Sequence, residues 1–426
     1  MSVSLVTQRD VTPGAAVHRL PLRALLGANT VSCIGNFMTL VALPWFVLET
    51  TGSAAKTGLA AMAVALPQVL AGFFAGSLVD RLGYKRTSVL ADFAAGGTVA
   101  LVPLLYHLHG LAFWQLLLLV FAGNLLNAPG NTARQSLLPD LIALAGAPAD
   151  RTNAWYQSTY NAGFLVGPLT AGLAIAAIGA SNVLLLDAAT FAFSAAAVAL
   201  AVPVIAAVRA PVGRYTDHLR EGVRFIGADR LLLGLAATTV AVGFIGPAFQ
   251  SVLLPVYARA LYGTPLSLGI LRAAFGGGML LGTVLYGLWG DRVPQRRLFA
   301  GLFVACAPPL VLLLLRPSLT LAAVALVALA AAFGPTIPIR TTIYQVRTPP
   351  ALRSRVFGTV AALQFAAAPL GTLFDGLALQ RLGVAGTLGM ILAVWIVFTL
   401  TVCIAPAFRM MDVPRVVTGP RVVPVR

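Results

Sequence analysis

Twelve mostly apolar stretches recur along this chain of 426 residues, each close to the ~20 residues that a helix needs to cross a bilayer. Because 59% of the residues are hydrophobic and only 10% are charged, the apolar surface is too large for one water-soluble core. The chain is therefore expected to be an all-α membrane protein. The expected spans are residues 23–49, 57–79, 87–107, 111–135, 153–178, 182–208, 231–258, 266–290, 298–315, 318–345, 356–380 and 384–407.

An internal repeat divides these spans into two sets of six. The segment from Pro44 to Asp80 aligns without a gap with the segment from Pro255 to Asp291. Two further pairs keep the same order, Arg134 with Arg340 and Pro168 with Pro369. A membrane unit carried twice is typical of secondary transporters. We therefore expect two equivalent six-helix halves.

The net charge of +16 marks membrane sidedness rather than nucleic-acid binding. With both termini in the cytoplasm, nearly all of the 29 Lys and Arg residues fall at cytoplasmic ends or loops. The exceptions are Lys56, Arg259, Arg272, Arg316 and Arg381. This asymmetry predicts cytoplasmic termini, a lipid bilayer as the surroundings, and no nucleic-acid partner.

The spans and the basic loops together give the expected domain organisation. It comprises a cytoplasmic N-terminal tail (1–20), an N-terminal six-helix bundle (21–208), a cytoplasmic linker (209–229), a C-terminal six-helix bundle (230–407) and a cytoplasmic C-terminal tail (408–426). The first twenty residues are too polar for the core of a signal peptide, so the mature chain is expected to be the full chain.

Several functional classes are disfavoured by what the sequence lacks. Cys33, Cys306 and Cys403 lie in apolar spans without CxxC or Cys/His spacing, which argues against a zinc site or a disulfide framework. No GxxxxGK[ST] phosphate loop occurs, and the linker is too short for a nucleotide-binding domain. No nucleophile–base grouping is present either. We expect no enzyme activity, no metal and no cofactor.

The loop after the second expected span reads GSLVDRLGYKR, from Gly76 to Arg86. Its glycines allow close helix approach, Asp80 suits a helix N-terminus, and its basic residues favour the cytoplasm. This loop resembles the signature between helices 2 and 3 of the major facilitator superfamily. The resemblance implies twelve transmembrane helices in two pseudo-symmetric six-helix bundles, with both termini cytoplasmic.

In that family the signature latches the two bundles together when the transporter faces outward. The resemblance implies that Asp80 contacts the start of the eleventh helix, a charge–dipole contact worth ~0.3–1 kcal/mol. The chain departs from the pattern at Tyr84, where a basic residue is usual, and at Pro294 in the repeat copy, where a glycine is usual. The latch and gating candidates are Gly76, Asp80, Arg81, Gly83, Lys85, Arg86, Asp291, Arg292, Arg134 and Arg340.

A second motif lies on the fifth span. Gly163, Gly167, Pro168 and Gly172 form a pattern that resembles the GxxxGP motif of the family's drug and proton antiporters. Small residues four apart permit tight packing, and a proline bends the helix. The alternative is that glycine and proline are simply common in membrane helices.

Four further blocks resemble the branch that contains siderophore and macrolide exporters. They are ALPWFVLETTGSA from Ala42, ALPQVLAGFFAGSLVDR from Ala65, NAPGNTARQSLLPDLI from Asn127 and PPALRSRVFG from Pro349. The resemblance implies proton-driven efflux of a bulky amphipathic compound, such as a drug, macrolide or siderophore-like molecule. It does not identify the substrate.

Ionisable residues inside the spans each require a reason, because a charge at the bilayer centre costs at least ~2.5–3.5 kcal/mol. Asp92, two turns into the third span, either joins a cluster with Arg81, Arg86 or Arg134, or carries a proton. Asp187 either caps its helix and faces water, or takes part in coupling.

Three more ionisable residues lie toward the outer side. Arg272 and Asp375 either snorkel outward or face the cavity between the halves as part of an outer gate or a sensor of substrate charge. Glu49, at the outer end of the first span, either belongs with these gate candidates or is an ordinary residue at the outer rim. The proton-coupling candidates are Asp92, Glu49 and Asp375.

In the family fold, helices 1, 4, 7 and 10 line a central cavity. These spans offer amide and hydroxyl groups and no carboxylate at mid-depth, which suits an uncharged or amphipathic solute. Arg134 and Arg340, at the cytoplasmic ends of the fourth and tenth spans, either form an inner gate or snorkel. The substrate-cavity candidates are Asn29, Asn36, Gln115, Asn124, Asn127, Gln250, Arg272, Thr341, Tyr344 and Gln345.

These observations favour a secondary active transporter that exports an amphipathic small molecule by alternating access, with the proton gradient as its energy source. The alternatives are a proton-coupled uptake symporter for a metabolite, or a transporter-like membrane sensor without flux. We expect a monomer in the plasma membrane of a bacterium, with a small-molecule substrate.

Overall fold

The computed structural model of this protein describes residues 19–204, 215–349 and 352–411. All the regular structure in these ranges is helical. The N-terminal half contains α1 (Leu20–Thr51), α2 (Ala54–Leu82), α3 (Tyr84–Leu108), α4 (Phe113–Leu144), α5 (Ala149–Ile178) and α6 (Ala180–Ala201). The linker contains α7 (Tyr215–Ala228). The C-terminal half contains α8 (Arg230–Ala248), η1 (Phe249–Leu253), α9 (Leu254–Tyr262), α10 (Pro265–Trp289), η2 (Gly290–Arg292), α11 (Gln295–Ala305), α12 (Ala307–Leu314), α13 (Leu319–Phe333), α14 (Thr336–Arg347), α15 (Arg353–Ile404) and α16 (Pro406–Arg409).

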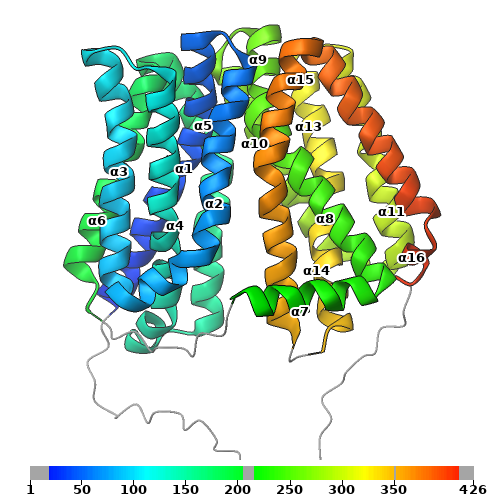
Figure 1. Ribbon diagram of the computed structural model, residues 1–426, viewed down its shortest axis with the longest axis horizontal. Helices are drawn as coiled ribbons and strands as arrows, with labels where there is room; N and C mark the ends of the chain where they lie inside the picture. The colour runs from blue at the N-terminus through cyan, green and yellow to red at the C-terminus, as the bar shows by residue number, and fades with distance from the viewer. Residues whose placement is uncertain (1–18, 205–214, 350–351, 412–426) are drawn as a thin grey trace, which may run out of the picture.

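The helices form two groups that stand side by side, one from each half of the chain (Figure 1). Among the described residues, eleven helical segments are long and apolar enough to cross a membrane. The last of these, 355–404, contains two of the expected spans. Gly383 has φ +67° there, a conformation that glycine adopts without strain, and the chain reverses direction at this point. The expected all-α membrane fold is confirmed.

Three spans of the C-terminal half change their helical hydrogen bonding along their length, although the residues at the junctions keep helical backbone angles. The expected span 231–258 consists of α8, the π-helix η1 and α9. Pro255 lies in the first turn of α9 and has no N–H to donate, so the regular hydrogen-bond ladder cannot continue through this point. A π-helical turn inside an α-helix often marks a functional position. The structure thus differs here from the uniform spans expected from hydropathy.

One end of the molecule, which we call the basic end, carries the turn between α2 and α3, the helix α7 and the arginine-rich start of α15. Figure 1 shows α7 lying across this end. Gly222 of α7 packs against Thr359 and the carbonyl of Arg355, and Glu221 forms an ion pair with Arg355. The linker helix is thereby fixed to the C-terminal half.

A second ion pair at the basic end joins Asp229, which caps α8, to Arg347 at 3.0 Å. Burial by itself would raise the pKa of Asp229. Hydrogen bonds from Arg347 and from the backbone N–H groups of Leu231 and Leu232 outweigh burial and lower the pKa of this carboxyl. The pair ties the start of α8 to the end of α14.

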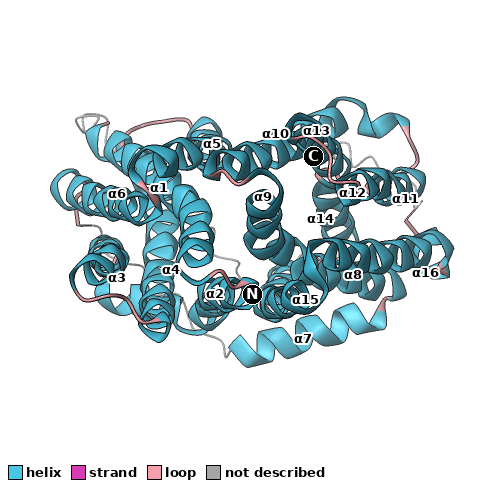
Figure 2. Ribbon diagram, turned by 90° about the horizontal axis from the view of Figure 1, so that it is seen from above, coloured by secondary structure: helices cyan, strands magenta, loops and turns pink. Residues whose placement is uncertain are grey.

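The two halves meet at the opposite end of the molecule along two seams. In the first, between α2 and α15, Gly58 faces Gly376 and the carbonyl of Thr372. In the second, between α5 and α10, Gly172 faces Gly269. Figure 2 shows these two pairs of helices side by side, with α9 between them. Toward the basic end the backbones of the two halves diverge (Figure 1).

Candidate functional site

A cavity of about 730 Å³ lies beneath the two seams. It is lined mainly by α1, α2 and α4 of the N-terminal half, with fewer residues from α3, α5 and α6, and the C-terminal half contributes Ser251 and Phe365. None of its lining residues in the described part of the chain is charged. The lining side chains with amide, hydroxyl or thiol groups are Asn29, Cys33, Asn36, Thr39, Thr57, Gln68, Thr98, Asn124, Asn127, Asn131, Thr132, Gln135, Tyr156, Tyr160 and Ser251.

Four of the ten predicted cavity residues line this space, namely Asn29, Asn36, Asn124 and Asn127. The other six are not among its lining residues: Gln115, Gln250, Arg272, Thr341, Tyr344 and Gln345. The structure corrects the prediction for Gln115, whose side chain accepts a hydrogen bond from the N–H of Ala112 at the start of α4. It also corrects the prediction for Tyr344, which is buried and packs edge-on against Phe357.

The cavity also contains polar residues that the sequence argument missed. Gln68 lies on α2, and Tyr156 and Tyr160 lie on α5. They were missed because only the first, fourth, seventh and tenth spans were searched. The two tyrosines are four residues apart, so they share one helix face, and this spacing was a signal that the sequence already contained.

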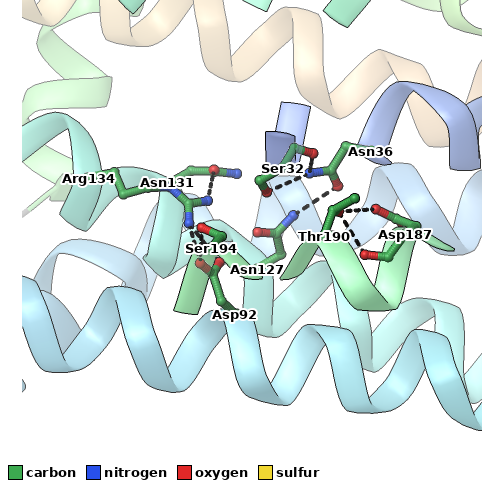
Figure 3. Close-up of polar contacts among 9 residues, drawn as sticks. All are labelled: Ser32, Asn36, Asp92, Asn127, Asn131, Arg134, Asp187, Thr190 and Ser194. Atoms are coloured by element: carbon green, nitrogen blue, oxygen red, sulfur yellow. Dashed lines mark hydrogen bonds and ion pairs between the residues drawn. The ribbon is translucent and has the colours of Figure 1, made fainter. Parts of the chain in front are cut away.

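Hydrogen bonds between the lining amides hold part of the cavity wall in place. Asn127 Nδ2 donates to Asn36 Oδ1 at 3.5 Å, and Asn36 Nδ2 donates to the carbonyl of Ser32 at 2.8 Å (Figure 3). Asn29 donates to Thr159 at 2.6 Å. The Oδ1 atom of Asn127 is buried and has no partner among the described residues. Asn127 therefore offers a hydrogen-bond acceptor to a solute.

Asp92 lies in a buried network beside this wall (Figure 3). Nη1 of Arg134 lies 2.7 Å from each carboxylate oxygen of Asp92, and the two side chains are 1% and 0% exposed. Ser194 donates to Asp92 at 2.7 Å, and Arg134 donates to Asn131 at 2.7 Å. The structure thus brings Asp92 to Arg134, whereas its ion pairs among described residues include neither Arg81 nor Arg86. These hydrogen bonds offset part of the desolvation cost of the buried pair, although Arg134 Nε has no partner among the described residues.

Arg340, the repeat counterpart of Arg134, has different partners. It donates to Thr239 Oγ1 at 2.9 Å and to the carbonyl of Thr336 at 3.3 Å. It forms no ion pair with a carboxylate of the described residues. Both arginines are buried, so neither snorkels. They do not contact each other, and their assignment to an inner gate stays a prediction.

The latch candidates fall at the basic end. The surroundings of Gly76 and the side chains of Asp80 and Asp291 lie outside what the structure describes. Gly83 has φ +79° and makes the turn from α2 to α3. Three basic candidates are exposed there, namely Arg81, Arg86 and Arg292, and Lys85 is half-buried. None of the ion pairs that join described residues includes these four side chains. The latch itself stays a prediction.

The GxxxGP segment of α5 forms close contacts on two sides. Toward α1, Gly163 and Gly167 pack directly against Phe37. Toward α10, the carbonyl of Pro168 and the backbone of Gly172 face Gly269. Pro168 and Gly172 therefore join the two halves at the second seam, while Gly163 and Gly167 pack α5 against α1. Here the glycines have a specific packing function, which chance abundance in membrane helices would not explain.

The remaining ionisable candidates are buried, with one exception. Arg272 is 7% exposed and donates to the carbonyl of Gln250 on η1, and Asp375 is 3% exposed. Snorkelling was therefore wrong for both. One carboxylate oxygen of Asp375 has no hydrogen-bond partner among the described residues. The exception is Glu49, which is exposed and accepts from Trp45 Nε1 at 2.7 Å, consistent with a position at the rim.

Asp187 was expected either to face water or to take part in coupling, and the first alternative is wrong. Its side chain is 1% exposed. Its Oδ2 atom accepts a hydrogen bond from Thr39 at 2.6 Å, and Thr39 lines the cavity.

Comparisons with known proteins agree with this architecture. The sequence model of the Major Facilitator Superfamily matches residues 25–372. The multidrug efflux pump Tap of Mycobacterium tuberculosis is 33% identical over 406 residues, which cover 93% of this chain and 96% of that protein. Macrolide efflux protein A of Streptococcus pyogenes is 23% identical, over 86% of this chain and 91% of that protein.

Two solved structures show the same fold at low sequence identity. The nucleoside transporter NupG has a TM-score of 0.74 and 11% identity, with 92% of this chain and 98% of that chain covered. A bacterial homologue of the lysosomal transporter Spinster, in an inward-facing and unoccupied conformation, has a TM-score of 0.71 and 17% identity, with 94% and 98% covered.

Proposed function

Because the chain belongs to the Major Facilitator Superfamily, a family of membrane transporters rather than enzymes, we propose that it exports amphipathic small molecules from a bacterial cell. The names of the relatives support this direction and this class of solute, since they are described as a multidrug efflux pump and a macrolide efflux protein. The substrate is expected to be a drug-like, macrolide-like or siderophore-like compound.

The observation that carries the proposal is the chemistry of the cavity. Its volume of about 730 Å³ is within the range of sites that enclose drug-sized ligands. Its lining combines apolar side chains with amides and hydroxyls, and lacks charged groups among the described residues. A solute with an apolar body and a few uncharged polar groups matches this wall, with Asn127 as an available acceptor.

We propose that the basic end faces the cytoplasm, following the positive-inside rule. The seams at Gly58–Gly376 and Gly172–Gly269 then close the outer side, and the structure corresponds to the inward-facing state of an alternating-access cycle. Opening these seams while closing the basic end would expose the same cavity to the outside. The short glycine contacts support this proposal, because they join helix backbones directly and the two helices of each seam can move apart as rigid bodies.

The energy source is proposed to be the proton gradient, without a bound cofactor. Asp92, Glu49 and Asp375 were the candidates for coupling. The ion pair of Asp92 with Arg134 favours a structural role for Asp92. We further propose that the transporting unit is a monomer in the plasma membrane.

The test is transport into proteoliposomes that contain the purified chain. Chloramphenicol is a suitable first probe, because it is amphipathic and uncharged and is not trapped by a pH difference; erythromycin represents the macrolides. An antiporter accumulates the solute when the lumen is acid, since protons leave as solute enters. A symporter does so only when the exterior is acid. Protein-free liposomes provide the control.

Protein-dependent accumulation with an acid lumen is the expected result. Accumulation only with an acid exterior would replace the export proposal with uptake. If neither solute moves under either gradient or by exchange, the transport proposal is wrong and a sensor without flux becomes the better interpretation.

A further inference from the structure

Asp187 is a buried acid on α6 to which the function described above assigns no role. Its Oδ2 atom accepts from Thr39 Oγ1 at 2.6 Å. Its Oδ1 atom lies 3.2 Å from Thr190 Oγ1 (Figure 3). The facing helix α1 has a glycine at position 35. A Cβ at Gly35 would overlap both Asp187 Oδ1 and Thr190 Oγ1. The surface of α1 is therefore shaped to receive this carboxyl group.

No cationic side chain among the described residues pairs with Asp187. The helix α6 packs against α1, α3 and α5. The charged or titratable side chains described on those helices are Arg23, Cys33, Glu49, Tyr84, Lys85, Arg86, Asp92, Tyr106, His107, Tyr156 and Tyr160.

Each ionisable side chain that could pair with Asp187 either has another partner or lies near an end of its helix. Asp92 is bound to Arg134, and His107 contacts Ser181 in the first turn of α6, which precedes Asp187 along the helix. Arg23, Lys85 and Arg86 lie at the basic end of their helices. An ionised carboxylate buried without a countercharge costs several kcal/mol, so such a group takes up a proton instead.

The hydrogen bonds around Asp187 match the protonated form. Thr190 has one hydroxyl hydrogen, and its shorter contact, 2.7 Å, is with the carbonyl oxygen of Asp187. The longer contact of Thr190 Oγ1, 3.2 Å from Asp187 Oδ1, shares the same hydrogen. With a proton on Oδ2 the carboxyl group donates to Thr39 Oγ1, 2.6 Å away, and the Thr39 hydroxyl can turn its own hydrogen toward the cavity that it lines.

Asp187 is also connected to the cavity. Thr39, its hydrogen-bond partner, lines the cavity, and so does Leu184, which lies one turn earlier on α6. The other two buried acids differ. Asp92 is held by a guanidinium, and Asp375 lies in the other half and is not among the lining residues. Among the described acids, Asp187 alone combines the lack of a countercharge with a hydroxyl link to the cavity.

We propose that Asp187 binds the transported proton and exchanges it with cavity water through Thr39. This inference rests on the proposed proton-coupled transport. On release, the carboxyl O–H bond breaks at Oδ2, whose proton passes to Thr39 Oγ1 while Thr39 gives its own hydroxyl proton to water in the cavity. The carboxylate keeps the electron pair, and Thr39 is left as a neutral hydroxyl. The hydroxyl of Thr190 then turns from the carbonyl oxygen to the carboxylate. Rebinding reverses these steps when the cavity opens to the other side of the membrane.

The proton itself is the probe for the first test. Infrared difference spectra of the full chain in lipid nanodiscs, recorded across a pH titration, report the carbonyl stretch of protonated carboxyl groups. Asp187→Asn is expected to lose one component of this band. Asp375→Asn, a matched change of a buried acid in the other half, is expected to keep that component. An Asp187→Asn spectrum equal to that of the wild type would overturn the proposal, as would loss of the component only in Asp375→Asn.

A second pair of variants tests the route through Thr39. Thr39→Val removes the hydroxyl with little change in shape and is expected to slow the deuterium shift of the Asp187 band after transfer to D2O. Thr39→Ser keeps the hydroxyl and is expected to restore the wild-type rate. Equal rates in Thr39→Val and the wild type would exclude this route.

Chloramphenicol uptake separates a failure of this inference from a failure of the proposed function. Gradient-driven accumulation by the wild type and its loss in Asp187→Asn support both. If the wild type accumulates the solute and Asp187→Asn does so equally, Asp187 is not the coupling site, although export stands. If the wild type shows no gradient dependence, the coupled function fails, whatever the infrared spectra show about Asp187.

Discussion

The seam between α5 and α10 offers a direct way to shift the conformational equilibrium of the transporter. A Cβ added to Gly269 would lie 2.5 Å from the carbonyl oxygen of Pro168 and 3.2 Å from the Cα of Gly172. Ordinary contact begins at 3.4 Å, so Gly269→Ala requires the two helices to separate by about 0.9 Å. Both neighbouring atoms belong to the backbone and cannot rotate away.

This overlap should raise the free energy of the conformation with the closed seam only. Overpacking by a methyl group typically costs ~1–3 kcal/mol. The cost is present while the seam is closed and is relieved when the halves separate there. The population is therefore expected to shift roughly 5–150-fold toward the conformation that is open at this end. The gain in helix propensity from Gly to Ala, ~0.8–1.0 kcal/mol, applies to both states and cancels.

Distances between spin labels at the closed end measure this shift. Leu108 at the end of α3 and Leu315 at the end of α12 are exposed there, at 62% and 72%, one in each half. Cysteines at these two positions, in a background without the native cysteines, carry the labels. Gly277→Ala is the matched control, because it lies on the same helix and the nearest neighbouring atom would be 4.0 Å away.

A longer label-to-label distance should gain population in Gly269→Ala and not in Gly277→Ala. Gly58→Ala, at the other seam, should act in the same direction, since its Cβ would lie 2.7 Å from the carbonyl of Thr372. Identical distance distributions for Gly269→Ala and Gly277→Ala would refute the reasoning, because the overlap would then not oppose closure.

Three further predictions follow from the polar contacts. Asp92→Asn leaves the charge of Arg134 buried without a countercharge and should lower the free energy of unfolding by ~3–5 kcal/mol. Adding Arg134→Met should recover part of this loss, which thermal denaturation measures. Because the pKa of Asp229 is lowered in the folded state, its ion pair stabilises the fold at pH values above the ordinary pKa of Asp. This stabilisation is lost as the pH falls through the lowered pKa. Melting curves at several pH values should therefore show that this ion pair's contribution to the free energy of unfolding, about 0.5–1 kcal/mol, is lost at low pH in the wild type. Asp229→Asn should lack this contribution at every pH. Asn127→Asp places a carboxylate in the neutral cavity and should raise uptake of a cationic dye relative to chloramphenicol by about tenfold, or ~1.4 kcal/mol; an unchanged ratio would show that solutes do not contact this position.

The repeat illustrates how far sequence reasoning reaches in this chain. Matching Arg134 with Arg340 placed both at corresponding depths of their halves, because the repeat preserves the order of the helices. It did not predict their chemistry. Arg134 has a carboxylate partner on α3, whereas Arg340 bonds to a threonine on α8. Two positions related by a repeat share a backbone location, while their partners come from other helices that have diverged separately.

The cavity candidates show the same limit. Asn36 and Asn127 were found because their spans line the centre of the family fold. Gln68 and Tyr160 were missed, and Tyr344 was wrongly placed, because the face that a helical residue presents depends on how the helix is rotated against its neighbours. Hydropathy shows which segments enter the membrane. In a chain that is apolar on nearly every face, it does not show which side of a helix faces lipid, a neighbouring helix or the cavity.

The sequence by itself determined the membrane class, the twelve spans, the two halves and the family. These follow from local composition, charge and motif order, which each segment carries on its own. Only the tertiary structure decided the seam at which the glycines of α5 meet α10, the pairing of Asp92 with Arg134, and the isolation of Asp187 beside Thr39. The physical reason is that burial and countercharge are properties of packed neighbours, and residues such as Thr39 and Asp187 become neighbours only when distant helices are brought together.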